Sequence, residues 1–134
     1  MRERRALQAA VAVACLVPIL TGLDGVLRGA AIFRLAALPT SLDSHFRYLS
    51  GIFLMLGLAF ASTIPAIEHQ GKRFRLLGAM VVMGGLARAL SWADVGPPGL
   101  GHKLGLAMEL VVVPLLMLWQ ARVARRVAHD PTAR

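Results

Sequence analysis

"GGLARALSWADVGPPGLGHKLGLAMEL", residues Gly84–Leu110, contains two apolar segments separated by a Gly-Pro-Pro-Gly break. A helix cannot continue through this break, because proline lacks a backbone N–H and glycine is a poor helix former. The stretch therefore predicts two antiparallel helices joined by a short connection. Each predicted helix carries one charged residue within its apolar run, Arg88 in the first and Glu109 in the second.

These two charged residues are equally far from the break, since the midpoint between positions 88 and 109 falls inside Gly-Pro-Pro-Gly. In an antiparallel hairpin we expect Arg88 and Glu109 to lie at the same depth, about 9 Å inside their helices at 1.5 Å per residue. A lone charge deep in a membrane costs roughly 2.5 to 3.5 kcal/mol, so pairing is the default expectation. Ser91 follows Arg88 by one helical turn and lies on the same face.

The composition of the whole chain places such helices in a membrane. The chain has 134 residues, of which 57% are hydrophobic and 16% are charged, and its mean hydropathy is +0.64. A membrane-spanning helix needs roughly 20 apolar residues. We expect an all-α fold, an integral membrane four-helix up-down bundle, in one domain over residues 1–134 with a basic cytoplasmic tail at 123–134. The predicted spans are about 6–27, 46–67, 74–93 and 103–122.

The distribution of lysine and arginine predicts the orientation of these spans. Five of the 15 basic residues fall on the side opposite the termini, and they are Arg28, Arg34, Arg47, Arg88 and Lys103. The other ten lie on the side of both termini, so the positive-inside rule predicts that both termini are cytoplasmic. The net charge of +8 reflects this topology. No nucleic-acid partner is expected, because the basic residues cluster at span ends without interleaved aromatic residues.

Cofactor and catalytic signatures are missing from the sequence. Cys15 is the only cysteine, which excludes an intramolecular disulfide or a redox pair. His45 and His102 lie in separate loops without metal-ligand spacing, and no Gly-x-Ser-x-Gly elbow surrounds Ser91. We expect no cofactor, no metal, no catalytic residue and no enzymatic activity.

Glycines and prolines within the spans give two further expectations. Small residues at Gly57, Gly78, Gly84 and other positions are expected to let the second and third helices approach closely. Pro114 falls inside the fourth predicted span, where we expect a kink.

The first hairpin also carries ionisable side chains at its connection. Asp24 and Arg28 have i,i+4 spacing, which favours a local pair on one helix. The motif "DSHFR", residues 43–47, opens the next predicted helix, and Asp43 or Ser44 is expected to be its N-cap.

Both hairpins therefore bring polar residues to the end of the bundle that faces outward, whereas the inner half of its interior contains almost none. This asymmetry predicts an outward polar pocket closed below by apolar side chains. The Arg88–Glu109 pair fits either a structural role or a ligand- or proton-handling role. The ligand-binding candidates are Asp24, Arg28, His45, Arg47, Arg88, Ser91 and Glu109.

Several of these residues lie in motifs that resemble a known family. The segments "LTGLDGVLRG", "DSHFRYLSGIFLMLGL", "GGLARALSW" followed by "GPP", and "MELVVVPLLMLW" are similar to successive motifs of small bacterial membrane proteins grouped as domain of unknown function 4345. The resemblance covers roughly Leu16 to Arg122. It implies a four-helix inner-membrane protein related in architecture to the DoxX-like group, whose members are associated with quinone-linked or redox membrane complexes. It implies no established activity, and its motifs mark Asp24, Arg47, Arg88, Ser91 and Glu109.

We therefore expect a non-enzymatic membrane protein whose outward pocket binds a small or amphipathic ligand, such as a lipid headgroup or a quinone-like molecule. One alternative is a structural or accessory subunit of a membrane complex, a redox complex included. A weaker alternative is a proton-coupled carrier that uses Glu109 as its titrating group. The expected partners are membrane lipids and either another membrane protein or a second copy of the chain.

Overall fold

The computed structural model describes residues 2–129, which are mostly helical and contain no strand. In chain order the elements are α1 (Arg2–Arg28), the 3₁₀ helix η1 (Gly29–Phe33), α2 (Thr40–Ala61), the 3₁₀ helix η2 (Ile64–Ala66), α3 (Gly71–Val95), α4 (Leu100–Ala107), the π-helical segment η3 (Met108–Val112) and α5 (Val113–Ala128). Four helical stretches are long and apolar enough to cross a membrane, namely Arg2–Phe33, Thr40–Ala66, Gly71–Val95 and Leu100–Ala128. The predicted all-α class with four membrane-length helices is confirmed.

The helices extend beyond the predicted spans. The fourth stretch was expected to end at 122, but α5 continues to Ala128. Val123 in this extension is only 3% exposed, so packing of an apolar side chain carries the helix into the segment predicted as a tail. Residues 130–134 of that predicted tail lie outside the described part of the chain.

The start of α2 corrects a second expectation. Asp43 or Ser44 was predicted to be the N-cap, but the helix begins at Thr40 and its N-cap is Pro39, which makes no side-chain capping bond. The proline ring fixes φ, here −64°, and the chain enters the helix directly after it. Asp43 therefore lies in the first turn of α2, where its carboxylate is available to another segment.

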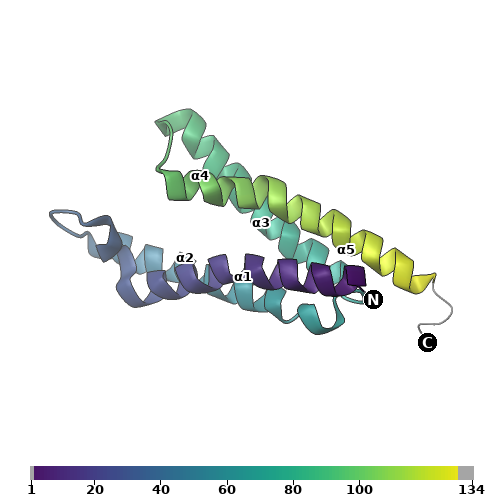
Figure 1. Ribbon diagram of the computed structural model, residues 1–134. Helices are drawn as coiled ribbons and strands as arrows, with labels where there is room; N and C mark the ends of the chain where they lie inside the picture. Colours follow the sequence, from purple (N-terminus) through teal and green to yellow (C-terminus); the bar gives the residue numbers. More distant parts are fainter. Residues whose placement is uncertain (1, 130–134) are drawn as a thin grey trace. The chain divides into compact units, whose positions relative to one another are not determined.

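Within the predicted single domain, the contacts form two compact units. One unit is Gln8–Ile64, which holds most of α1 together with η1 and α2. The other combines Met1–Leu7 with Pro65–Arg134 and so holds the first residues of α1 along with α3, α4, η3 and α5. Figure 1 shows α1 running beside α2 in the first unit and α3 beside α5 in the second.

Glycines allow close helix packing within each unit. A Cβ atom on Gly57 of α2 would lie 2.9 Å from a side-chain atom of Ile19 in α1. A Cβ on Gly78 of α3 would collide with Met117 of α5, whereas one on Gly84 would meet nothing within 4 Å. These small residues therefore bring α2 against α1 and α3 against α5.

Candidate functional site

Arg88 of α3 and Glu109 of η3 form an ion pair, with Arg88 Nε 3.2 Å from Glu109 Oε1. They are the two residues that the symmetry of the hairpin predicts to meet. The Glu109 side chain is 10% exposed and the Arg88 side chain 42% exposed. The Glu109 carboxylate is therefore buried, while part of the Arg88 guanidinium is accessible at the surface.

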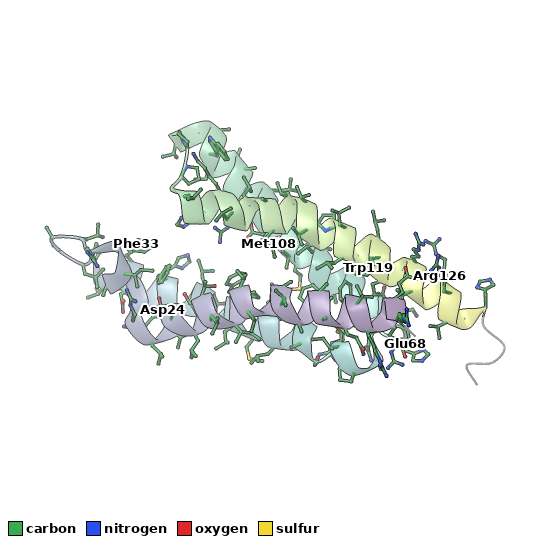
Figure 2. All side chains as sticks on the ribbon, viewed as in Figure 1. Asp24, Phe33, Glu68, Met108, Trp119 and Arg126 are labelled. Atoms are coloured by element: carbon green, nitrogen blue, oxygen red, sulfur yellow. The ribbon has the colours of Figure 1, made fainter. Side chains whose placement is uncertain are left out.

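A widened helical turn presents Glu109. The N–H of Val113 donates to the carbonyl of Met108, five residues earlier, which is the π-helical spacing. Pro114 follows directly and has no N–H to donate to the carbonyl of the residue four positions earlier, with which its ring would also clash. The helix thus accommodates Pro114 through a π-turn that contains Glu109. The sequence predicts only a kink at this proline. Figure 2 labels Met108 at the start of this turn.

The close approach of η3 to α3 depends on Gly85, one turn before Arg88. A Cβ atom on Gly85 would lie 2.9 Å from Glu109 Cβ and 2.7 Å from Leu110 Cδ2. Both distances are shorter than carbon atoms tolerate, so a side chain at this position would push the two helices apart. The glycine therefore lets Glu109 reach Arg88.

A cavity of about 90 Å³ adjoins this pair. It has room for roughly three water molecules, or one small polar group of a larger molecule. The lining residues come from α3, the connection and α4, and they are Arg88, Ser91, Trp92, Gly96, Pro98, His102 and Leu106. Trp92 contributes to the cavity wall, and Lys103 Nζ lies 5.5 Å from the centre of its ring.

Unused hydrogen-bonding capacity remains at this site. Within residues 2–129, Arg88 pairs with Glu109 through Nε, and its Nη groups carry further donors. Glu109 Oε2 is buried without a hydrogen-bond partner in the same part of the chain. Ser91 and His102 add a hydroxyl and an imidazole, each able to donate or accept. The site can therefore hold a polar group that accepts hydrogen bonds from a guanidinium.

The first hairpin uses its charges differently. Asp43 Oδ1 accepts a hydrogen bond of 2.8 Å from the N–H of Ala30 in η1. The other carboxylate oxygen, Oδ2, accepts one of 2.8 Å from Arg47 Nε, four residues along α2. Asp43 therefore joins the start of α2 to the segment that follows α1.

Arg47 completes this connection. Its Nη1 donates to the carbonyl of Val26 at 2.5 Å and to that of Leu27 at 3.1 Å. Both carbonyls lie in the last turn of α1, where no intrahelical N–H remains to pair with them. Gly29 has φ +59° and so takes the left-handed conformation, and a Cβ on it would lie 2.7 Å from Arg47 Nε. We call Asp43, Arg47 and Gly29 the clamp.

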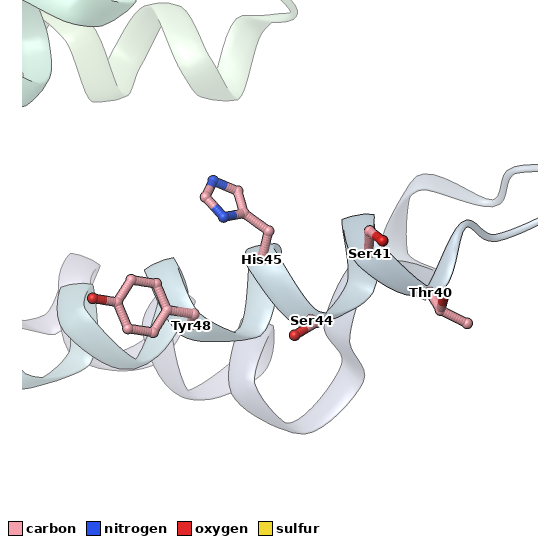
Figure 3. A pocket seen from close by; sticks show the side chains of 5 residues that line it. All are labelled: Thr40, Ser41, Ser44, His45 and Tyr48. Carbon is pink, nitrogen blue, oxygen red and sulfur yellow. The ribbon is translucent and has the colours of Figure 1, made fainter.

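The other ligand-binding candidates of this hairpin, Asp24, Arg28 and His45, have exposed side chains. Arg28 Nη1 lies 3.3 Å from Asp24 Oδ1, and both side chains are about half exposed or more, which fits the local i,i+4 pair. Figure 2 labels Asp24 near the end of α1. His45 projects from an exposed face of α2 that also carries Thr40, Ser41, Ser44 and Tyr48 (Figure 3). This face forms a shallow, open depression.

The structure thus brings Arg88, Ser91 and Glu109 to one site. It distributes the remaining candidates of the first hairpin among the clamp, the Asp24–Arg28 pair and the His45 face. Among residues 2–129, no three His, Cys, Asp or Glu side chains are grouped to hold a metal ion.

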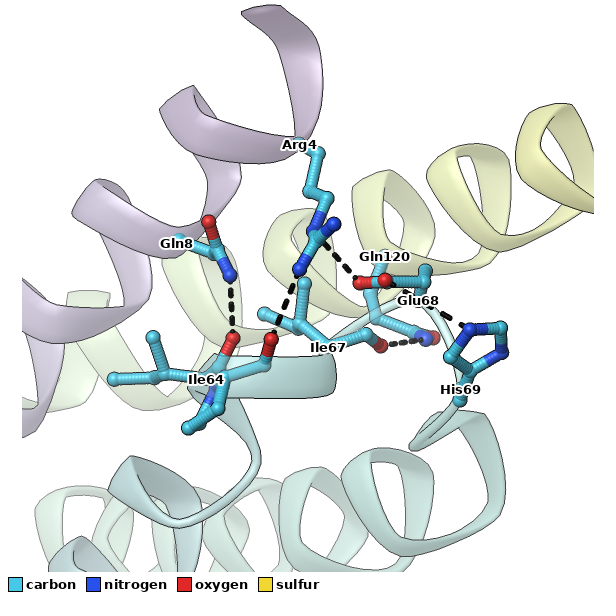
Figure 4. Close-up of polar contacts among 8 residues, drawn as sticks. Arg4, Gln8, Ile64, Ile67, Glu68, His69 and Gln120 are labelled. Atoms are coloured by element: carbon cyan, nitrogen blue, oxygen red, sulfur yellow. Dashed lines mark hydrogen bonds and ion pairs between the residues drawn. The ribbon is translucent and has the colours of Figure 1, made fainter. Parts of the chain in front are cut away.

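Sequence reasoning missed a polar cluster near the start of α3. We expected almost no ionisable side chains and mainly apolar ones in the interior at this end, and the structure adds buried polar groups there. Gln120 of α5 is fully buried, and its Nε2 donates a 2.8 Å hydrogen bond to the carbonyl of Ile67 (Figure 4). An amide inside the fourth predicted span was the available signal, because a buried amide must find a partner.

Arg4 joins the same cluster from the first residues of α1. Its Nη2 donates to the carbonyl of Pro65 at 3.0 Å, and its Nε lies 3.0 Å from Glu68 Oε2 (Figure 4). Glu3 pairs with two α5 residues, Arg122 at 3.2 Å and Arg126. These contacts join the first turn of α1 to the α2–α3 connection and to α5.

Four membrane-length helices, two polar connections and a half-exposed arginine held by a buried glutamate define a class of small all-α proteins of membrane-spanning dimensions. Residues 6–120 match the family described as "Domain of unknown function (DUF4345)". The chain belongs to this family, as its motifs indicated, and the match includes both the clamp and the Arg88–Glu109 pair. Comparisons with curated proteins and with solved structures gave no match. The relationship to the DoxX-like group stays a prediction.

Proposed function

We propose that this protein spans a bacterial inner membrane with both termini in the cytoplasm. Four apolar helices of sufficient length and the excess of basic residues on the side of the termini support this orientation. In a Cys15→Ser background, a cysteine at Ala37 should react with a membrane-impermeant maleimide applied to intact spheroplasts, and one at Gln70 should react only after permeabilisation. The reverse pattern would contradict the proposed orientation.

We further propose that the protein binds the polar head of an amphipathic molecule at Arg88. The observation that carries this proposal is a half-exposed guanidinium with one nitrogen held by a buried carboxylate, lining a cavity. Because Glu109 fixes the planar group, less freedom is lost when a ligand oxygen binds to the Nη donors.

The surroundings of the cavity fit an amphipathic ligand better than a small soluble one. At about 90 Å³ the cavity is well below the roughly 300 Å³ at which pockets for drug-sized ligands begin. It therefore admits a polar head alone. Leu90 and Leu104 of the same hairpin are 63% and 60% exposed, and such apolar surface suits an acyl or prenyl chain beside the head.

The test is the set of molecules that co-purify with the protein in mild detergent, measured by native mass spectrometry and lipidomics. Arg88→Ala and Arg88→Lys should lose a molecule that wild type retains, since lysine keeps the charge beside Glu109 but lacks the planar fork. Arg28→Ala and Arg28→Lys are matched controls in an exposed pair and should retain it. Equal occupancy in wild type and both Arg88 variants would exclude the proposed site.

A further inference from the structure

We propose that the Arg88 site selects a neutral polar head that offers a carbonyl or hydroxyl oxygen, and discriminates against an anionic one. This inference rests on the proposed function and specifies the class of ligand. It follows from how the charge of Arg88 is already balanced.

The positive charge of Arg88 is already balanced by Glu109. Arg88 lines the cavity, and the Glu109 carboxylate lies 3.2 Å from its Nε. Over residues 84–110 the two basic residues, Arg88 and Lys103, are matched by two acidic ones, Asp94 and Glu109. An anion that approached the Arg88 Nη groups would therefore also approach the buried carboxylate paired with Nε of the same guanidinium, and like charges in such a setting oppose binding.

Arg88 still has hydrogen-bond donors to offer a ligand. The ion pair with Glu109 through Nε balances the charge of Arg88 but leaves its Nη donors in place. A neutral carbonyl can accept from these donors without approaching Glu109 as a like charge. Ser91 and His102 can accept from a hydroxyl on the same head, while Trp92, Pro98 and Leu106 supply apolar walls.

Two kinds of membrane molecule have a neutral head of this type. A diacylglycerol carries ester carbonyls and a free hydroxyl, and a quinone carries ring carbonyls. Direct binding measurements on the purified protein can distinguish them with three probes of similar tail length: dioctanoylglycerol, a quinone with a ten-carbon tail, and dioctanoyl phosphatidylglycerol as the anion.

For the wild type we expect at least one neutral probe to bind about tenfold more tightly than the phosphatidylglycerol probe, because the anion meets Glu109. The stronger of the two neutral probes identifies the source. Tighter binding of the anionic probe, with dependence on Arg88, would overturn this inference while leaving the proposed function intact. Binding of every probe that is unchanged in Arg88→Ala, or no binding of any probe, would overturn both.

Glu109→Gln gives a second and opposite signal. It keeps the shape and an acceptor oxygen but removes the negative charge, so affinity for the anionic probe should rise about tenfold while the neutral probe changes little. A loss of anion affinity in this variant would contradict the inference. Lys103→Gln is the matched control that changes one charge outside the cavity lining, and it should not invert the wild-type preference. If Glu109→Gln does not fold, the order of affinities in the wild type still decides the question.

Discussion

Arg47 and Arg88 occupy similar places in the two hairpins, each close to a connection and each beside a carboxylate, yet their surroundings differ. Arg47 donates to Asp43 and to two backbone carbonyls at the end of α1. Arg88 pairs with Glu109 and lines a cavity. The comparison teaches that a conspicuous charge is not itself a binding site. What matters is how many of its donors the protein already uses.

The position of each arginine relative to helix ends explains the difference. Arg47 lies opposite the last turn of α1, where carbonyls lack intrahelical partners and recruit any nearby donor. Arg88 lies seven residues before the end of α3 at Val95, where the neighbouring carbonyls are satisfied within the helix. These neighbouring carbonyls of α3 are therefore not available to accept hydrogen bonds from the Arg88 Nη groups.

The largest loss of stability is expected when the clamp is disrupted. Arg47→Ala removes hydrogen bonds from a charged donor to Asp43, Val26 and Leu27, and should lower the free energy of unfolding by about 2–3 kcal/mol. Chemical unfolding in detergent measures this loss. Arg28→Ala, in an exposed pair, should cost less than about 1 kcal/mol. Equal costs for the two variants would show that the clamp does not stabilise the hairpin.

Two adjacent glycines test how the Arg88 site is built. Gly85→Ala places a methyl group against Glu109 and Leu110, so it should lower the free energy of unfolding by about 1–3 kcal/mol and weaken ligand retention. Gly84→Ala meets no atom within 4 Å and should be neutral, or stabilising by up to about 1 kcal/mol. If both variants behaved alike in thermal unfolding and ligand retention, close packing at Gly85 would not position Glu109.

A paired substitution separates binding from stability at the same site. Glu109→Gln should lower the free energy of unfolding by about 1–2 kcal/mol, because it weakens the partner of a half-buried arginine. Arg88→Met combined with Glu109→Leu removes both charges and should recover most of that loss. The double variant should nevertheless lack the ligand. A stable double variant that still retains the ligand would show that the pair has no part in binding.

The smallest expected effect concerns the hydroxyl in the cavity wall. Ser91 is exposed and lines the cavity, so Ser91→Ala should leave thermal stability unchanged. It should weaken ligand affinity about two- to tenfold, the loss of one hydrogen bond. A titration of the neutral probe measures this change. An unaltered affinity would remove Ser91 from the contact set.

Much of this molecule could be predicted from sequence. Apolar runs of membrane length identified four helices, and the central Gly-Pro-Pro-Gly break placed Arg88 opposite Glu109, because an antiparallel hairpin equates residues equidistant from its turn. The π-turn could not be predicted, since Pro114 can be accommodated by a kink or by a wider turn. The role of Arg47 was also hidden, because its acceptors are backbone carbonyls whose availability depends on where α1 ends. Gln120 carries no charge, so the pattern of ionisable residues does not reveal its buried hydrogen bond.

The most direct test of the difference between the two arginines is an experimental structure of the wild-type protein purified in mild detergent. We predict non-protein density within hydrogen-bonding distance of the Arg88 Nη atoms, in the cavity lined by Ser91 and His102. We also predict that Arg47 hydrogen-bonds only to Asp43 and the carbonyls of α1. Density at Arg47 together with an Arg88 guanidinium fully hydrogen-bonded to protein groups would contradict this difference between the two arginines.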